Sequence, residues 1–292
     1  RDMKKVKIIT DSNAGILQSE ATELGIIVVP MPFIINNEEF FEEISLDQKK
    51  FYKMLEDPNT NVSTSQPSEY YLTELWDTVL QDYDEVVFIP MSSGLSASCA
   101  NAKRYAERYN GRVQVVNNQR ISVTQRESVL EAIELAKLGK SAEEIKNYLE
   151  ETKFISSIYI MVDTLKYLKK GGRVTPAGAA LGTLLRIKPV LLIRGEKLDS
   201  FFKALSPRAA KAKMISQVAH ELETEFKEYW DQGKMVIDIA HSNNEQEALV
   251  FKKEIEEKIP GVKVRHIDAL SLSVSCHIGP GSLAIAVSVK NY

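Results

Sequence analysis

The 292-residue sequence has only two cysteines, Cys99 and Cys276. Two thiols are too few for a disulfide framework, which favours a reducing cytoplasm as the compartment. The sequence also lacks an apolar run of the ~20 residues that a helix needs to cross a bilayer, and it shows no signal-peptide pattern. We therefore expect a cytoplasmic protein with no integral membrane segment.

An excess of charge of one sign is also missing. The formal net charge is −3, which gives no electrostatic reason to expect a nucleic acid or an anionic membrane as a partner. The four histidines show no paired metal-ligand spacing, and neither cysteine has a near partner, so no metal site is expected. There is no Walker-type glycine loop, and Gly279-Pro280-Gly281 precedes a predicted strand, whereas a dinucleotide fingerprint opens a helix. No cofactor is predicted.

The length predicts two domains, because 292 residues exceed what one hydrophobic core usually serves. In the first half, short apolar runs alternate with helical patterns, which favours an α/β domain with a mostly parallel sheet flanked by helices. The second half predicts a smaller α/β or α+β sheet domain. We place the domain change after a strand at residues 157–162, giving domains of residues 1–165 and 166–292.

Capping residues predict several helix starts. Ser45 with Gln48, and Ser141 with Glu144, are capping-box patterns. Ser65 or Ser68 is expected to cap a helix whose apolar face runs over residues 71–79. A helix rich in alanine and glycine is expected over residues 175–185. Asn36-Asn37 indicates a hairpin turn, because asparagine tolerates a positive φ angle.

The segment Ser92-Ser93-Gly94-Leu95-Ser96 follows an apolar run at residues 86–90 and precedes a helical pattern. We expect it at a strand-to-helix turn, where the first helix amides are unpaired and the helix dipole is positive. Hydroxyl and amide groups at such a turn can surround an anion. The alternative is that Ser92 or Ser93 only caps the helix. Thr10–Asn13 and Asn117-Asn118 also follow predicted strands, at the sheet edge where ligands collect.

Enzymatic alternatives stay open at this point. Gly94-Leu95-Ser96-Ala97-Ser98 differs from a nucleophile elbow at its last position, so a serine hydrolase using Ser96 and His277 is one alternative. A phosphotransferase-like protein that uses His277 covalently is another; either enzyme would act on a small acyl or keto substrate. His277 also has a structural interpretation, as a side chain satisfied by the backbone of its turn. A further alternative is a regulatory or interaction module without a ligand.

Five blocks of the sequence together resemble the signature blocks of the DegV family. They are Thr10-Asp11-Ser12, Thr64-Ser65-Gln66-Pro67-Ser68, Ser92-Ser93-Gly94-Leu95-Ser96, Gly171-Gly172-Arg173 and His277-x-Gly279-Pro280-Gly281. They occur in the family's order and extend over nearly the whole chain, so the combination is specific although each block alone is weak.

The resemblance implies two α/β-type domains with a long-chain fatty acid between them, the C-terminal domain covering the lipid. Such proteins are the fatty-acid-binding subunit of a bacterial fatty acid kinase. They present the acyl carboxylate to a separate ATP-dependent kinase subunit and carry the acyl phosphate onward. The resemblance therefore implies a carrier without catalytic turnover of its own.

The resemblance also implies the residues of the site. The candidates for the fatty acid head group are Thr64, Ser65, Ser92, Ser93, Gly94 and His277, and Arg173 is expected at the pocket mouth or on the kinase-docking surface. Hydroxyl groups suit this role, because a carboxylate buried beside an apolar tail needs charge-assisted hydrogen bonds in place of water.

The chain departs from the family's usual pattern at three places. Ala97-Ser98-Cys99 stands where the family commonly has Gly-Thr-Tyr, and Asn117-Asn118 where it has Asp-Ser. Glycines usual after that are replaced around Thr124-Gln125-Arg126. The blocks that face the carboxylate are retained, so we keep the lipid-binding interpretation.

Overall fold

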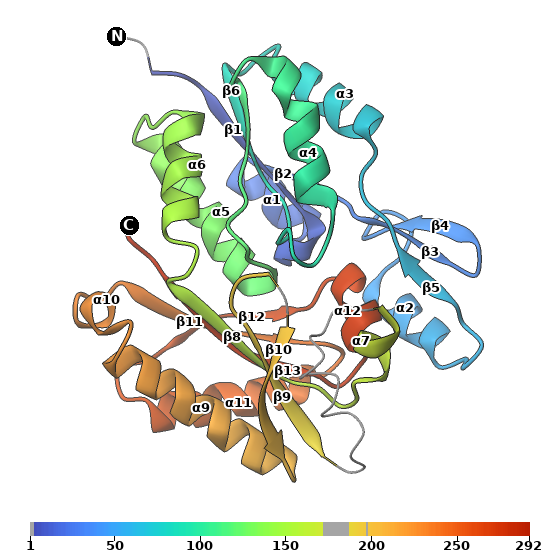
Figure 1. Cartoon of the computed structure of the whole chain (residues 1–292), viewed down its shortest axis with the longest axis vertical. Coiled ribbons are helices and arrows are strands. Elements are labelled where there is room, and N and C mark those ends of the chain that lie inside the picture. Colours follow the sequence, from blue (N-terminus) through green and yellow to red (C-terminus); the bar gives the residue numbers. More distant parts are fainter. Residues whose placement is uncertain (1–2, 172–186, 197) are drawn as a thin grey trace. The chain divides into compact units, whose positions relative to one another are not determined.

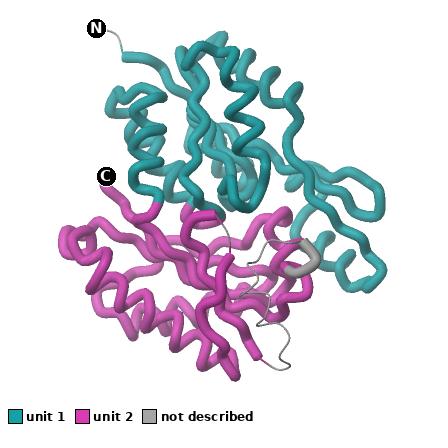
Figure 2. Tube along the Cα trace, in the orientation of Figure 1, with its two compact units in different colours: residues 1–121, 125–153 teal, residues 122–124, 154–292 magenta. Residues whose placement is uncertain are grey.

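The computed structural model in Figure 1 describes residues 3–171, 187–196 and 198–292. The chain divides into two compact units, which Figure 2 shows in teal and magenta. The first contains residues 1–121 and 125–153, and the second contains residues 122–124 and 154–292. Both units combine sheets with helices, which confirms the predicted α/β class.

The first unit is built on a four-stranded, entirely parallel sheet in the order β2-β1-β6-β7. Its strands are β1 (Val6–Asp11), β2 (Ile27–Val29), β6 (Glu85–Ile89) and β7 (Val113–Val115). Its helices are α1 (Gln18–Leu24), α2 (Gln48–Leu55), α3 (Glu69–Val79), α4 (Ser98–Ala106), α5 (Ser122–Lys137, whose first three residues belong to the second unit) and α6 (Ala142–Glu151).

Both faces of this sheet are covered by helices. Side chains alternate between the two faces of a strand, and the buried side chains of β6 divide accordingly. Val87 and Ile89 pack in a core with α5 and α6, while Val86 and Phe88 pack with α3 and α4. All of β6 is buried, which explains its continuous apolar run from Val86 to Ile89.

A small antiparallel sheet of order β4-β3-β5 extends the first unit. It consists of β3 (Pro32–Ile35), β4 (Glu38–Phe41) and β5 (Val62–Thr64). Asn36 and Asn37 have φ angles of 50° and 68° and join β3 to β4, which confirms the predicted hairpin turn.

The second unit contains a six-stranded mixed sheet in the order β10-β9-β8-β13-β11-β12, so its sheet is not the smaller one that we predicted. Its strands are β8 (Ser156–Met161), β9 (Lys188–Ile193), β10 (Leu198–Ala204), β11 (Met235–His241), β12 (Val264–Ala269) and β13 (Leu283–Val289). Its described helices are α7 (Lys166–Gly171), α9 (Pro207–Glu223), α10 (Lys227–Asp231), α11 (Glu245–Lys258) and α12 (Leu272–Ile278).

Helices α9 and α11 lie side by side on one face of this sheet. Alternate residues of β13, from Leu283 to Val289, join Met214 and Val218 of α9 and Phe251 of α11 in one apolar core. The core explains the 3.6-residue periodicity of the two helices and the alternation within the strands.

The main segment of the second unit begins at Phe154, whereas we placed the domain change at residues 165/166. Strand β8, which we assigned to the first domain, pairs with β9 and β13 of the second sheet. The local sequence of an apolar strand does not show which sheet it joins, because that depends on pairing with strands far away in the sequence. The helix predicted over residues 175–185 lies outside the described residues.

Candidate functional site

The loop that follows β6 carries the central hydroxyl segment. Ser92 is buried, and its backbone N–H donates to the carbonyl oxygen of Arg120 at 2.9 Å. Its Oγ accepts from the backbone N–H of Gly94 at 3.3 Å, and its carbonyl oxygen accepts from the N–H of Leu95 at 3.1 Å. These bonds fold the segment into a turn that is complete before any helix begins.

The prediction that Ser92 and Ser93 stand at a helix start is therefore wrong. Helix α4 begins at Ser98, its N-cap residue is Ala97, and no side chain caps it there. Ser96 is the nearest hydroxyl, and its Oγ accepts from the N–H of Ser98 at 3.1 Å. Serine hydroxyls bond to nearby amides and compete with helix formation. This explains why α4 begins at Ser98 and not within the Ser92–Ser96 segment.

Ser93 differs from its neighbour Ser92. Its side chain is half-buried, as is Gly94, and within the described part of the chain its hydroxyl has no hydrogen-bond partner. A partly enclosed hydroxyl without a protein partner is free to bind a ligand oxygen. Ser93 is thus the member of the segment whose hydroxyl is available for recognition.

Asp11, at the end of β1, holds this loop in place. Its Oδ2 accepts from the backbone N–H of Met91 at 2.8 Å, and its Oδ1 accepts from the N–H of Asn13 and Nε2 of Gln125, each at 3.0 Å. Asp11 is fully buried, and desolvation raises the pKa of its carboxyl group above the usual range although these bonds oppose the shift. The carboxyl group therefore fixes the start of the Ser92 loop relative to β1.

Gln125 completes the same network from α5. Its Nε2 also approaches Oγ1 of Thr10 at 3.0 Å and the carbonyl oxygen of Ile89 at 3.1 Å. We did not assign Gln125 or Asp11 to the site from the sequence. The signals in the sequence are an acidic residue directly after an apolar run, and Gln125 within the segment that replaces the family's usual glycines.

The second hydroxyl segment lies at the end of β5 in the same unit. Thr64 is half-buried and pairs with Phe33 of β3, whereas Ser65 is exposed and donates its N–H to the carbonyl oxygen of Pro32 at 3.1 Å. Neither is a helix cap, because Ser68 caps α3 by accepting from the N–H of Tyr71 at 3.0 Å.

Hydrogen bonds connect the small sheet and the β5–α3 segment to the parallel sheet and its helices. Ser12 Oγ accepts from the N–H of Met31 at 3.0 Å and donates to the buried Glu42 at 3.2 Å. Gln66, directly after Ser65, accepts from Nδ2 of Asn101 in α4 at 2.8 Å. The segments that contain Thr64 and Ser92 are thus both attached to the carboxyl-end loops and helices of one parallel sheet.

His277 belongs to the second unit, where it is half-buried in the last turn of α12. The turn after it is fixed by Ser242, whose Oγ donates to the carbonyl oxygen of Gly279 at 2.6 Å and accepts from the N–H of Ser282 at 3.0 Å. The N–H of Gly281 also donates to the carbonyl oxygen of Ser242 at 2.7 Å. Strand β13 follows this turn, as the sequence predicted.

Arg173 lies outside the described residues, as does Gly172, while Gly171 ends α7. The other candidates are divided between the units. Thr64, Ser65, Ser92, Ser93 and Gly94 belong to the first unit, and His277 belongs to the second.

The hydrolase alternative gains no support from Ser96, because its Oγ is engaged with the first amide of α4. Cys99 is no better a nucleophile, since burial raises the pKa of its thiol to about 11 and leaves it protonated at neutral pH. None of the helices in the described ranges has both the length and the apolar character that a bilayer crossing requires.

Comparison with known proteins places this chain in a family. The family model described as "Uncharacterised protein, DegV family" matches residues 5–290. Protein DegV of Bacillus subtilis is 31% identical over 287 residues, which cover 98% of this chain and 99% of that protein.

Solved structures agree. The crystal structure of Bacillus subtilis DegV, described as a fatty acid binding protein, superposes with a TM-score of 0.84 at 29% identity, covering 98% of this chain and 100% of that chain. A DegV family protein of Thermus thermophilus, described by its fatty acid binding, gives a TM-score of 0.82 at 25% identity over 98% of this chain and 99% of that one. The chain belongs to the DegV family.

Proposed function

We propose that this protein binds a long-chain fatty acid and presents its carboxylate to a separate ATP-dependent fatty acid kinase subunit. The similarity over nearly the whole chain to DegV of Bacillus subtilis, a fatty acid binding protein, carries the proposal. The partner transfers phosphate to the carboxylate, and this protein carries the acyl phosphate onward without catalytic turnover of its own. It acts in the cytoplasm, where its free cysteines stay reduced.

The Ser92 loop supports the head-group part of the proposal. The available hydroxyl of Ser93 donates to a carboxylate oxygen, while Ser92 keeps the loop folded around Gly94. Hydroxyl donors replace the helix-dipole contribution that the sequence suggested, because α4 begins only at Ser98.

The family resemblance assigns four further residues. Thr64 and Ser65 contribute to the same head group, His277 contributes its imidazole, and Arg173 serves the pocket mouth or the kinase-docking surface. The acyl tail supplies most of the affinity, at about 0.8 kcal/mol for each buried CH₂ group.

Mass spectrometry tests the binding directly. The protein is purified without added lipid, and its native mass is compared with the fatty acid content of an organic extract. We expect one long-chain fatty acid per chain. An empty protein that no fatty acid of any length stabilises against thermal unfolding would overturn the proposal.

A further inference from the structure

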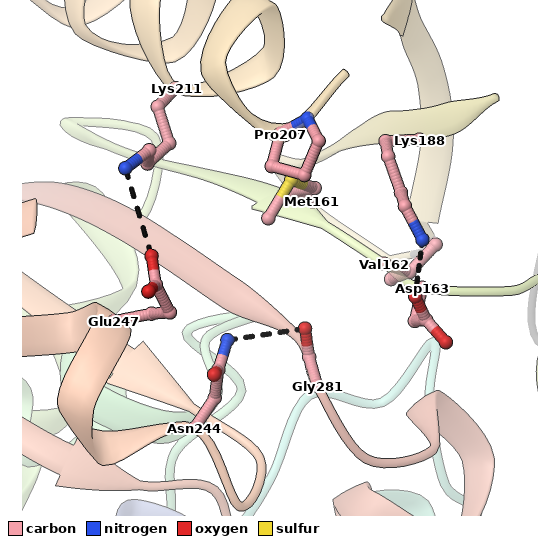
Figure 3. Close-up of a pocket in the computed structure, with 9 residues that line it drawn as sticks. All are labelled: Met161, Val162, Asp163, Lys188, Pro207, Lys211, Asn244, Glu247 and Gly281. Atoms are coloured by element: carbon pink, nitrogen blue, oxygen red, sulfur yellow. Dashed lines mark hydrogen bonds and ion pairs between the residues drawn. The ribbon is translucent and has the colours of Figure 1, made fainter. Parts of the chain in front are cut away.

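A cavity of about 280 Å³, whose lining includes two lysines and two carboxylates, lies within the second unit (Figure 3). Strands β8 and β11 end beside it, while β9 and β13 begin there. The cavity therefore lies at one end of the four central strands of the six-stranded sheet. A water molecule takes about 30 Å³ of liquid volume, so the space is large enough for a ligand of several heavy atoms. The cavity shares no residue with the Ser92 loop.

Lys211 of α9 forms one wall of the cavity, and its side chain is only 12% exposed. Its Nζ donates to Glu254 at 2.7 Å, a carboxylate outside the cavity lining, and lies 3.8 Å from Glu247, which is beyond hydrogen-bond distance. An ammonium group has three donors, so Glu254 orients Lys211 and leaves two donors for a group inside the cavity.

Lys188, at the start of β9, lies on the opposite side (Figure 3) and is paired with Asp163. The lysine side chain is 29% exposed and the carboxylate 57%. Glu247 is similarly 56% exposed. Ion pairs with exposed carboxylates are weak, so an incoming anion can displace Asp163 and Glu247 into water while the more enclosed lysines stay in place.

Asn244 also lines the cavity and lies below the two lysines in the view of Figure 3. It is the N-cap residue of α11, but its side chain does not cap the helix, since its Nδ2 donates to the carbonyl oxygen of Gly281 at 3.3 Å. Its Oδ1 has no hydrogen-bond partner in the described ranges, which leaves an acceptor for a ligand hydroxyl. The cavity therefore offers two cations on opposite sides and a neutral polar group between them.

We propose that this cavity binds a compound with two phosphoryl groups, one at Lys211 and the other at Lys188. The diphosphate is the recognised group, either free or as part of a nucleoside diphosphate. Among the described residues, none that lines the cavity has an aromatic ring on which a base would stack, so the diphosphate supplies most of the binding. This site is additional to the proposed fatty acid function.

Calorimetric titration of the full chain with pyrophosphate and with ADP at constant ionic strength tests the site. We expect both probes to bind, and Lys211→Gln or Lys188→Gln to weaken pyrophosphate about ten-fold or more, because each removes a charge-assisted hydrogen bond. Lys211→Arg should restore binding. Arg208→Gln is the matched control, since Arg208 is exposed in the first turn of α9 and does not line the cavity.

The outcomes separate the sources of the diphosphate. Equal affinity for the two probes supports free diphosphate, and tighter binding of ADP supports a nucleotide. Absence of binding by the folded wild type, or equal weakening in Arg208→Gln, would overturn the proposal. Fatty acid content measured on the same samples keeps this result distinct from the test of the proposed function.

Discussion

A Cβ atom added to Gly279 would lie 2.6 Å from Cδ2 of Tyr167. The aromatic ring from α7 therefore packs directly on the backbone of the turn that follows His277. Gly279 also has a φ angle of +81°, which disfavours other residues. The turn after α12 and helix α7 thus share one contact that only glycine permits.

Gly279→Ala is expected to lower the free energy of unfolding by about 2 kcal/mol or more, through overpacking against Tyr167 and a strained φ angle. In a chain that already carries Tyr167→Ala, Gly279→Ala should lower the free energy of unfolding by less, because the ring that the new Cβ would contact is gone. Gly233→Ala is the control, because Gly233 has a φ angle of +71° but no atom near its added Cβ. Urea denaturation gives all four values, and strictly additive effects would contradict the contact.

Ser93→Ala should weaken fatty acid binding about ten-fold or more, because a hydrogen bond to a charged group contributes about 1.5–3 kcal/mol. Its stability should change by less than about 0.5 kcal/mol, since the hydroxyl has no protein partner in the described residues. Ser92→Ala should instead cost about 1 kcal/mol of stability, by removing the acceptor for Gly94. Binding and denaturation curves of both variants decide between these roles; unchanged binding in Ser93→Ala would exclude Ser93 from the site.

Asp11 should make the stability depend on pH. Its pKa is raised in the folded state by desolvation, so the folded protein holds the proton more tightly than the unfolded chain. The resulting stabilisation is fully present below the unfolded pKa of about 3.9 and is lost as the pH rises through the folded pKa.

Asp11→Asn removes this titration and also places an amide donor against the N–H groups that the carboxylate now accepts. We expect the stability of the wild type relative to Asp11→Asn to fall as the pH increases above about 4. Urea denaturation of both proteins across this range measures the difference. If the free energy of unfolding of the wild type instead rises with pH relative to that of Asp11→Asn, the pKa of Asp11 is lowered in the folded state and the prediction is wrong.

Arg173→Ala should leave fatty acid content unchanged and lower phosphate transfer by the kinase subunit about ten-fold. The expectation follows from the proposed docking role of Arg173. Arg208→Ala, which removes an exposed arginine from α9, is the control for general loss of positive charge. Acyl phosphate formed with ATP and the kinase is the measurement, and equal transfer by wild type and Arg173→Ala would remove the docking role.

Local features of the fold were predictable wherever neighbouring residues decide the structure. Ser141 and Glu144 form the predicted capping box of α6. Ser45 does not cap α2, because its hydroxyl is engaged with the backbone of Phe41 and Asp47 accepts from the N–H of Lys50 instead. Two competing acceptors so close in sequence cannot be ranked without the turn that orients them.

Long-range features were beyond the sequence. Gln125 reaches Asp11 across 114 positions of the chain, and no local pattern marks such a pair. The same holds for β8, whose apolar residues fit either sheet until β13 is known to lie beside it. The sequence predicts the hydroxyl segments, but which serine folds the loop and which is available depends on bonds formed by the backbone.

The position of β13 has a consequence for biosynthesis. It lies between β8 and β11 in the middle of its sheet, although it follows the other five strands of that sheet along the chain. Until the ribosome has released residues 283–289, the ladder β10-β9-β8 and the pair β11-β12 have no strand to join them. The first unit can fold during translation, whereas the second must wait with two open strand edges, which makes nascent chains stalled before β13 prone to aggregation.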